Sequence, residues 1–148
     1  MPVNIKVQKL SLNAQLPRYA HTGPWGDLAA DLYASAPATL APAGQPGSTQ
    51  AIPTGLAMQF PATHGALVED RSGLALRGLT TLAGVIDPGY RGELKIVLTN
   101  LGQAIVDIAP GDRIAQLRLV QRIEAQFEEV AELLPAPRGD AGFGSTGA

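Results

Sequence analysis

The sequence contains no cysteine, and histidine occurs only twice in its 148 residues, as His21 and His64. The lack of cysteine excludes disulfide bonds, catalysis by a thiolate and zinc sites with cysteine ligands. Two histidines are too few for a histidine-rich metal site. Disulfide-stabilised scaffolds and cysteine-based enzymes are therefore ruled out before any motif is considered.

The sequence also lacks strong charge and long apolar runs. Its net charge is only -2, so it has no basic field of the kind that holds a nucleic-acid backbone. No apolar run approaches the roughly 20 residues that span a membrane, and the alternating N-terminus MPVNIKVQKL does not resemble a signal peptide. We therefore expect a cytoplasmic protein that binds neither nucleic acid nor membranes.

Glycine and proline, by contrast, are frequent, with 17 and 12 residues respectively. They divide the chain into short segments, which favours β-structure with many turns over a helix bundle. The apolar fraction of 45% and the charged fraction of 16% are those of an ordinary globular protein. At this length we expect one domain with a single core.

Alternating apolar and polar residues predict a series of strands. In GELKIVLTN, for example, Leu94, Ile96 and Leu98 share one face. The turns DPGYR and APGDR separate such runs, and strands that recur about every ten residues indicate an all-β barrel or sandwich, of jelly-roll type. The expected strands are residues 3–10, 29–35, 51–60, 79–86, 92–100, 104–108 and 114–120, with a surface loop at 36–50.

Two segments are compatible with a helix. FEEVAELL (127–134) has helical spacing but is short enough to be an edge strand instead. RSGLALR (71–77) could form a short helix with Ser72 as its N-cap. From Pro135 onward the composition is that of a linker and tail. We therefore predict a β-domain over 1–134 and a flexible glycine-rich arm over 135–148.

Asp87 and Tyr90 in VIDPGYRGE are the first candidate site residues. The simple interpretation is that Asp87 begins a turn, as aspartates often do. The functional interpretation makes Asp87 a general base and Tyr90 a platform for a planar or sugar group.

EDRSGLA offers the donors that a phosphate needs, namely Arg71, the Ser72 hydroxyl and the N–H groups around Gly73. The alternative is a helix cap beside a solvated arginine. The glycines and hydroxyls of RGDAGFGSTG could wrap a polyphosphate, although the segment is not a Walker A loop. A disordered tail is the alternative there.

Two polar residues lie in otherwise apolar strands. Gln116 in GDRIAQL either points to solvent or belongs to a site. Asp31 in AADLYAS either pairs with an arginine or orients a hydrated metal ion. Each of these signals is weak alone.

Five stretches in this order closely resemble the five motifs of the trimeric dUTPases (deoxyuridine triphosphate nucleotidohydrolases). They are AADLYAS, EDRSGLA, GVIDPGYRGE, GDRIAQL and RGDAGFGSTG, and the match runs from about residue 27 to 147. The resemblance implies a jelly-roll-like β-protein (β-clip) that forms a homotrimer with active sites at the subunit interfaces. It implies hydrolysis of dUTP to dUMP and pyrophosphate, which keeps uracil out of DNA and supplies dUMP for dTTP synthesis.

The resemblance also implies roles for individual residues. Asp87 would activate the water that attacks the α-phosphorus, and Tyr90 would pack under the deoxyribose. Asp31 would touch a hydrated Mg2+ held mainly by the triphosphate. The arm would close over a neighbouring subunit's site, with Phe143 on the uracil. The substrate-binding residues implied are Arg71, Ser72, Gly73, Val85, Ile86, Tyr90, Lys95, Gln116, Arg138, Phe143, Gly144, Ser145 and Thr146.

The sequence departs from the family pattern at three places. Asp70 stands where the family often has proline, and we expect its carboxylate to point away from the site. The asparagine that many members carry near the uracil is either replaced by Thr81 or absent, and Ala141 replaces a frequent glycine.

Two rival functions follow from the same fold. In dCTP deaminases, which resemble this chain at IDPG, a glutamate in the following strand takes part in deamination, and alignment places Val97 there. Valine cannot transfer protons. A non-enzymatic binding or regulatory module would require a damaged motif, and no motif is obviously damaged. The 36–50 loop remains a candidate surface for a regulatory partner.

Overall fold

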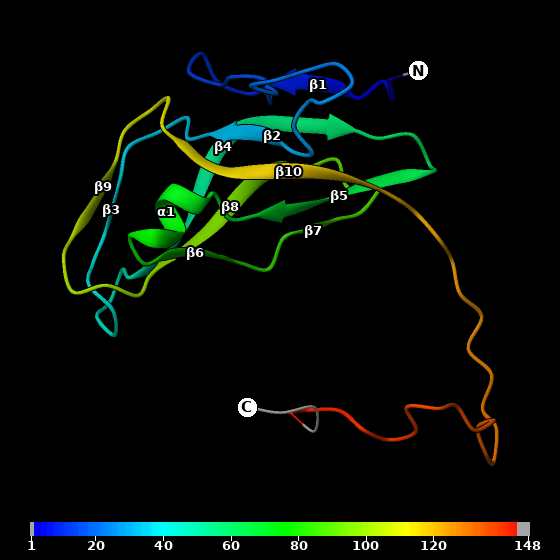
Figure 1. Ribbon diagram of the computed structural model, residues 1–148. Helices are drawn as coiled ribbons and strands as arrows, with labels where there is room; N and C mark the ends of the chain where they lie inside the picture. Colours follow the sequence, from blue (N-terminus) through cyan, green and yellow to red (C-terminus); the bar gives the residue numbers. More distant parts are fainter. Residues whose placement is uncertain (1, 145–148) are drawn as a thin grey trace.

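Three antiparallel sheets and one short helix make up the protein in a computed structural model that describes residues 2–144 (Figure 1). The first sheet has the order β1 (Lys6–Lys9), β4 (Thr49–Gln59), β8 (Glu93–Asn100) and β6 (Leu79–Leu82). The second has the order β2 (Ala30–Tyr33), β10 (Arg113–Gln121), β5 (His64–Glu69) and β7 (Val85–Ile86). β3 (Ala38–Leu40) pairs with β9 (Val106–Ile108).

The core lies between the inner faces of these sheets. Leu94, Ile96 and Leu98 of β8 are buried, as their alternation predicts. They belong to one cluster of buried residues with Leu32 of β2 and Ile114 of β10, which come from the second sheet. The prediction of an all-β sandwich or barrel is therefore confirmed.

The expected strand at 79–86 is divided between the two sheets. β6 pairs with β8, whereas β7 pairs with β5. Ala83 and Gly84 break the strand with φ angles of 64° and 125°. A Cβ at residue 84 would lie 2.8 Å from the carbonyl oxygen of Val68, so only glycine allows this approach. The turn DPGYR therefore joins strands of different sheets, β7 and β8.

The segment RSGLALR forms the helix α1 (Ser72–Leu76), which confirms the helical interpretation. The prediction that Ser72 is the N-cap of this helix was wrong. Arg71, with φ -90° and ψ 134°, occupies the cap position, no side chain caps the helix, and Ser72 lies within the first turn. Across the part of the chain that is described, no helix is long and apolar enough to cross a membrane.

The last strand, β10, ends at Gln121, and residues 122–144 contain neither helix nor strand. Both interpretations of 127–134 are therefore wrong. Phe127 and Leu134 are each 94% exposed, so this segment finds no apolar surface within its own chain that would stabilise a helix or an edge strand. Figure 1 shows the segment leading away from the sheets. The arm boundary at residue 135 remains a prediction.

Candidate active site

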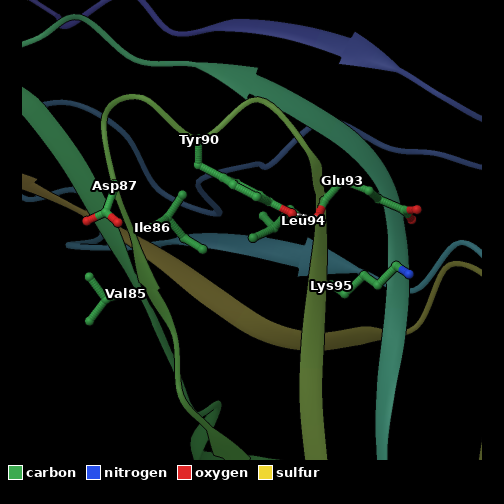
Figure 2. Close-up of a pocket in the computed structure, with 7 residues that line it drawn as sticks. All are labelled: Val85, Ile86, Asp87, Tyr90, Glu93, Leu94 and Lys95. Atoms are coloured by element: carbon green, nitrogen blue, oxygen red, sulfur yellow. Dashed lines mark hydrogen bonds between the residues drawn. The ribbon is translucent and has the colours of Figure 1, made fainter.

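A first pocket lies where β7 of one sheet ends and β8 of the other begins (Figure 2). Its volume is about 390 Å3. Glu93 and Leu94 line it together with five residues expected from the sequence: Val85, Ile86, Asp87, Tyr90 and Lys95. The structure thus brings the candidate base, the aromatic residue and the other expected residues of the third motif together.

Two hydrogen bonds, one from the backbone and one from the hydroxyl, hold Tyr90 in place. The Tyr90 N–H donates to the Asp87 carbonyl at 3.1 Å, which closes a turn. The Tyr90 hydroxyl donates to the Glu93 carbonyl at 2.7 Å. A Cβ at residue 92 would lie 2.6 Å from the Tyr90 hydroxyl oxygen, so Gly92 provides the space for this contact. The ring, which runs toward Glu93 in Figure 2, is therefore a fixed apolar wall of the pocket.

Asp87 lies in the same turn, next to the loop residue Pro88. Its side chain is exposed and lines the pocket. A carboxylate in such a position can accept a proton from a water molecule that a ligand brings within hydrogen-bond reach. The geometry therefore permits the role of general base.

The second pocket lies beside β2, β10 and the beginning of α1, and its volume is about 370 Å3. Asp31, Arg71, Ser72 and Gln116 line it, all of which the sequence singles out. Gly73 follows Ser72 in α1 but is not among the lining residues. The first, second and fourth motifs thus meet here, although they are distant in the sequence.

Two guanidinium groups flank the Asp31 carboxylate. Arg71 Nε donates to Asp31 Oδ1 at 3.1 Å, and Arg113 Nη1 lies 3.7 Å from Asp31 Oδ2. The structural alternative for Asp31, pairing with an arginine, therefore does occur. Because the two arginines share this one carboxylate, the group of three side chains keeps a net positive charge, which suits a phosphate ligand.

Other carboxylates near this pocket have their own partners. The backbone N–H of His21 donates to Asp27 Oδ2 at 2.8 Å, and the His21 ring lies 3.1 Å from Oδ1. These hydrogen bonds lower the pKa of Asp27. Arg118 Nε donates to Glu69 at 3.0 Å, and the hydrogen bonds from Arg118 lower the pKa of Glu69. Both carboxylates therefore stay charged, and Glu69 has Arg118 as its counter-charge.

Asp70 makes the densest set of hydrogen bonds in this region. Its carboxylate accepts from the Thr80 hydroxyl at 2.6 Å, the Thr81 N–H at 2.6 Å and the Thr81 hydroxyl at 2.8 Å. Its carbonyl accepts from Gln116 Nε2 at 2.6 Å. The carboxylate is thus turned to β6 instead of to Arg71. Thr81 is occupied by this contact and does not line the first pocket.

Sequence reasoning missed several residues that line these pockets, three of which carry polar side chains of interest here. Arg113 and His21 line the second pocket, and Glu93 lines the first. The position of Arg113 within GDRIAQL, three residues before Gln116, is a signal that could have identified it. Nothing in the sequence pairs His21 with the distant second and fourth motifs.

The described arm residues, 135–144, line neither pocket. Arg138 Nε donates to the Ala141 carbonyl at 2.6 Å, Phe143 is fully exposed, and Gly144 has a φ of 88°. Ser145 and Thr146 lie outside the described residues. The two pockets share no lining residue. One chain therefore holds the carboxylate and aromatic residue in one place and the phosphate-type donors in another.

A metal ion could be held here only with help from a ligand. Residues 2–144 contain no group of three or more histidine or acidic side chains that could hold a metal ion. Asp27, Asp31 and Glu69 line the second pocket but do not form such a group, and only Asp31 is flanked by the two arginines. Carboxylate oxygen suits Mg2+, which is usually held by one or two carboxylates together with substrate phosphates. The donor set fits an ion carried by a polyphosphate.

Comparison with known proteins places these features in a wider context. The dUTPase family model matches residues 19–147. The chain is 44% identical over 153 residues to a deoxyuridine 5'-triphosphate nucleotidohydrolase of Anaeromyxobacter sp. (strain Fw109-5), with 99% of each chain covered.

Two solved structures are also similar. One is the dUTPase of Staphylococcus bacteriophage 80alpha with dUPNHPP, at 26% identity and a TM-score of 0.85, with 98% of this chain and 99% of that chain covered. The other is a mutant dUTPase from phage phi11 of S. aureus, described for its coordination of a structural Mg(II) ion. It has 25% identity and a TM-score of 0.76, with 88% of this chain and 98% of that chain covered.

Proposed function

The chain belongs to the dUTPase family, and from this premise we propose that it hydrolyses dUTP to dUMP and pyrophosphate. The observation that carries the proposal is the chemistry of the two pockets. One has the Asp87 carboxylate beside an aromatic wall, and the other has two arginines and a hydroxyl beside Asp31. A nucleoside triphosphate requires both sets. In the cytoplasm such an enzyme would remove dUTP before DNA synthesis and supply dUMP for dTTP.

The first pocket would bind the nucleoside and provide the base. Val85, Ile86 and Lys95 would contact the uracil side, and the Tyr90 ring would pack under the deoxyribose. Asp87 would orient a water molecule and take its proton as the water attacks the α-phosphorus. The fixed position of the ring supports this proposal, since a rigid wall leaves little room for a 2′-hydroxyl.

The second pocket would bind the phosphates. A triphosphate brings about four negative charges, so a carboxylate base can act near it only when cations neutralise them. Arg71, Ser72, Arg113 and Gln116 are the donors available. Mg2+, bound mainly by the triphosphate, would supply further neutralisation, and Asp31 would hold it through a water molecule.

The separation of the pockets supports a homotrimer with composite sites. Since one chain does not join Asp87 to Arg71 in one cavity, a second copy would complete the site. The arm of a neighbouring copy would then cover it, with Phe143 on the uracil and Arg138, Gly144, Ser145 and Thr146 at the phosphates. The expected loop at 36–50 in fact contains β3 and the first residues of β4, so the candidate surface for a regulatory partner is limited to the connection 41–48.

The rival deaminase function is disfavoured by Val97. This residue lies in β8 and pairs with Ala51 and Leu82, so it occupies an apolar ladder position. An assay for ammonia release from dCTP tests the alternative, and sustained turnover would refute the assignment.

The direct test incubates the protein with Mg2+ and, separately, dUTP, dTTP, dCTP and UTP. We expect strong release of pyrophosphate from dUTP and almost none from the others. Equal turnover of UTP would contradict the role of Tyr90, and no turnover of dUTP would contradict the proposed function itself.

A further inference from the structure

Residues 70 and 80–81 form the two ends of a short loop that contains α1. The Asp70 carboxylate accepts three hydrogen bonds across this gap, at 2.6, 2.6 and 2.8 Å. All three come from Thr80 and Thr81 at the beginning of β6. The contact therefore closes the loop at its base, directly next to Arg71 and Ser72.

The helix inside the loop has little else to hold it. It is five residues long, contains no buried residue and has no side-chain N-cap. Helices this short are not stable by themselves in water. Leu74 is its only residue that packs, partly buried, against the described core cluster. Arg71 is also held through its side chain by Asp31, but the backbone of Arg71 and Ser72 depends on how the loop is anchored.

Asp70 also contacts a residue that lines the second pocket from β10. The Asp70 carbonyl accepts from Gln116 Nε2 at 2.6 Å. Gln116 lies in β10, opposite Asp31 and Glu69. Asp70 therefore connects β6 of the first sheet, the beginning of α1 and a strand of the second sheet. No ion pair involves the Asp70 carboxylate, among the residues described, so its contacts are directed hydrogen bonds.

We propose that Asp70 is a positioning residue that holds Arg71, Ser72 and Gln116 in register for the phosphates of the substrate. The proposal rests on the proposed function for the identity of that substrate. Asp70 itself contacts β6 and Gln116 and touches no reacting atom. A displacement of about 1 Å in positioning groups can cost on the order of a hundredfold in rate.

The test compares Asp70→Ala with Asp107→Ala. Asp107 is the matched control because its carboxylate also accepts from a threonine hydroxyl, that of Thr39, at 2.9 Å, but in the β3–β9 pair. We expect Asp70→Ala to weaken binding of the imido analogue dUpNHpp about tenfold, and binding of deoxyuridine less than about twofold, since deoxyuridine has no phosphates. Asp107→Ala should change neither.

A second readout does not depend on the nucleotide. Hydrogen exchange of the backbone amides of residues 71–78 should become faster in Asp70→Ala and stay unchanged in Asp107→Ala. If the unmodified protein binds neither dUpNHpp nor dUTP, the proposed function fails, whereas the exchange experiment still tests the anchoring role.

Conservative variants keep the test decisive if Asp70→Ala does not fold. Asp70→Asn retains one acceptor oxygen for Thr81 and should restore most of the affinity for dUpNHpp. Thr80→Val removes one donor and should show a smaller loss of the same kind. Equal weakening of dUpNHpp and deoxyuridine binding, or unchanged exchange at 71–78, would overturn the proposal.

Discussion

At the scale of single residues, the candidate site depends on where two side chains of one turn can lie. Asp87 and Tyr90 are three positions apart, and the hydrogen bond between their backbones closes the turn. The turn exposes the carboxylate to the pocket, and the ring is fixed through its hydroxyl. Their chemistry follows from residue type, but their joint position follows from the turn.

Asp87→Asn tests the general base. The amide keeps the size of the side chain but cannot accept the proton of water, so we expect kcat for dUTP to fall at least about 100-fold with binding of dUpNHpp retained. Pyrophosphate release and calorimetry measure the two quantities. Asp107→Asn is the control on a distant strand. Near-normal turnover of Asp87→Asn would refute the assignment.

Gly92→Ala tests the aromatic wall. The new methyl group would lie 2.6 Å from the Tyr90 hydroxyl oxygen, so the ring must move. We expect kcat/KM for dUTP to fall about tenfold. Gly89→Ala is the matched control in the same turn, because a Cβ there has no neighbour within 4 Å. Equal activity of both variants would mean that the ring position is unimportant.

At the scale of elements, two connections between strands determine which side chains reach the two pockets. The link between β6 and β7 carries the chain from one sheet to the other, which places Val85–Asp87 at the first pocket. The loop around α1 carries Arg71 and Ser72 to the second pocket. Both connections are closed by non-local contacts.

The Asp70 anchor predicts a pH dependence of stability. Burial raises the pKa of Asp70, but the hydrogen bonds from Thr80 and Thr81 outweigh it and hold the pKa below the ordinary value of 3.8. A carboxylate with a lowered pKa stabilises the fold above pH 3.8 and loses this contribution as pH falls through the folded-state pKa. The Tm of Asp70→Asn should therefore lie below that of the unmodified protein at pH 7, and the difference should shrink toward pH 3. A constant difference would contradict this.

Deletion of residues 138–148 tests the arm. The segment has no contact with either pocket in its own chain among the residues described, so the β-domain should fold and assemble without it. We expect hydrolysis of dUTP to be almost abolished, because closing segments exclude water and complete the site. Circular dichroism and light scattering provide the folding control. Full activity of the shortened chain would mean that the arm has no catalytic role.

At the scale of the whole molecule, the separation of the two pockets is the main feature. It predicts that two inactive variants complement each other. Asp87→Asn and Arg71→Ala, co-expressed in equal amounts, should recover about a quarter of normal activity, because random assembly joins an intact Asp87 with an intact Arg71 from another copy at that frequency. Size measurement should give a trimer. No recovery in mixed trimers would mean that each site is formed within one chain.

The sequence by itself determined the β-class, the apolar face of β8, the helix at α1 and the identity of the motif residues. These are local properties, carried by alternation, turn residues and short motifs. The prediction of a helix or an edge strand for FEEVAELL was wrong because helical spacing does not by itself provide an apolar surface against which the segment can pack.

Only the tertiary structure decided which segments pair. It divided residues 79–86 between two sheets, added Arg113 and His21 to the second pocket, and gave the Asp70 carboxylate its partners on β6. It also kept Asp87 and Arg71 in different pockets of one chain. The physical reason is that each of these contacts joins residues separated in the chain, so its geometry depends on how the intervening loops close and not on any local pattern.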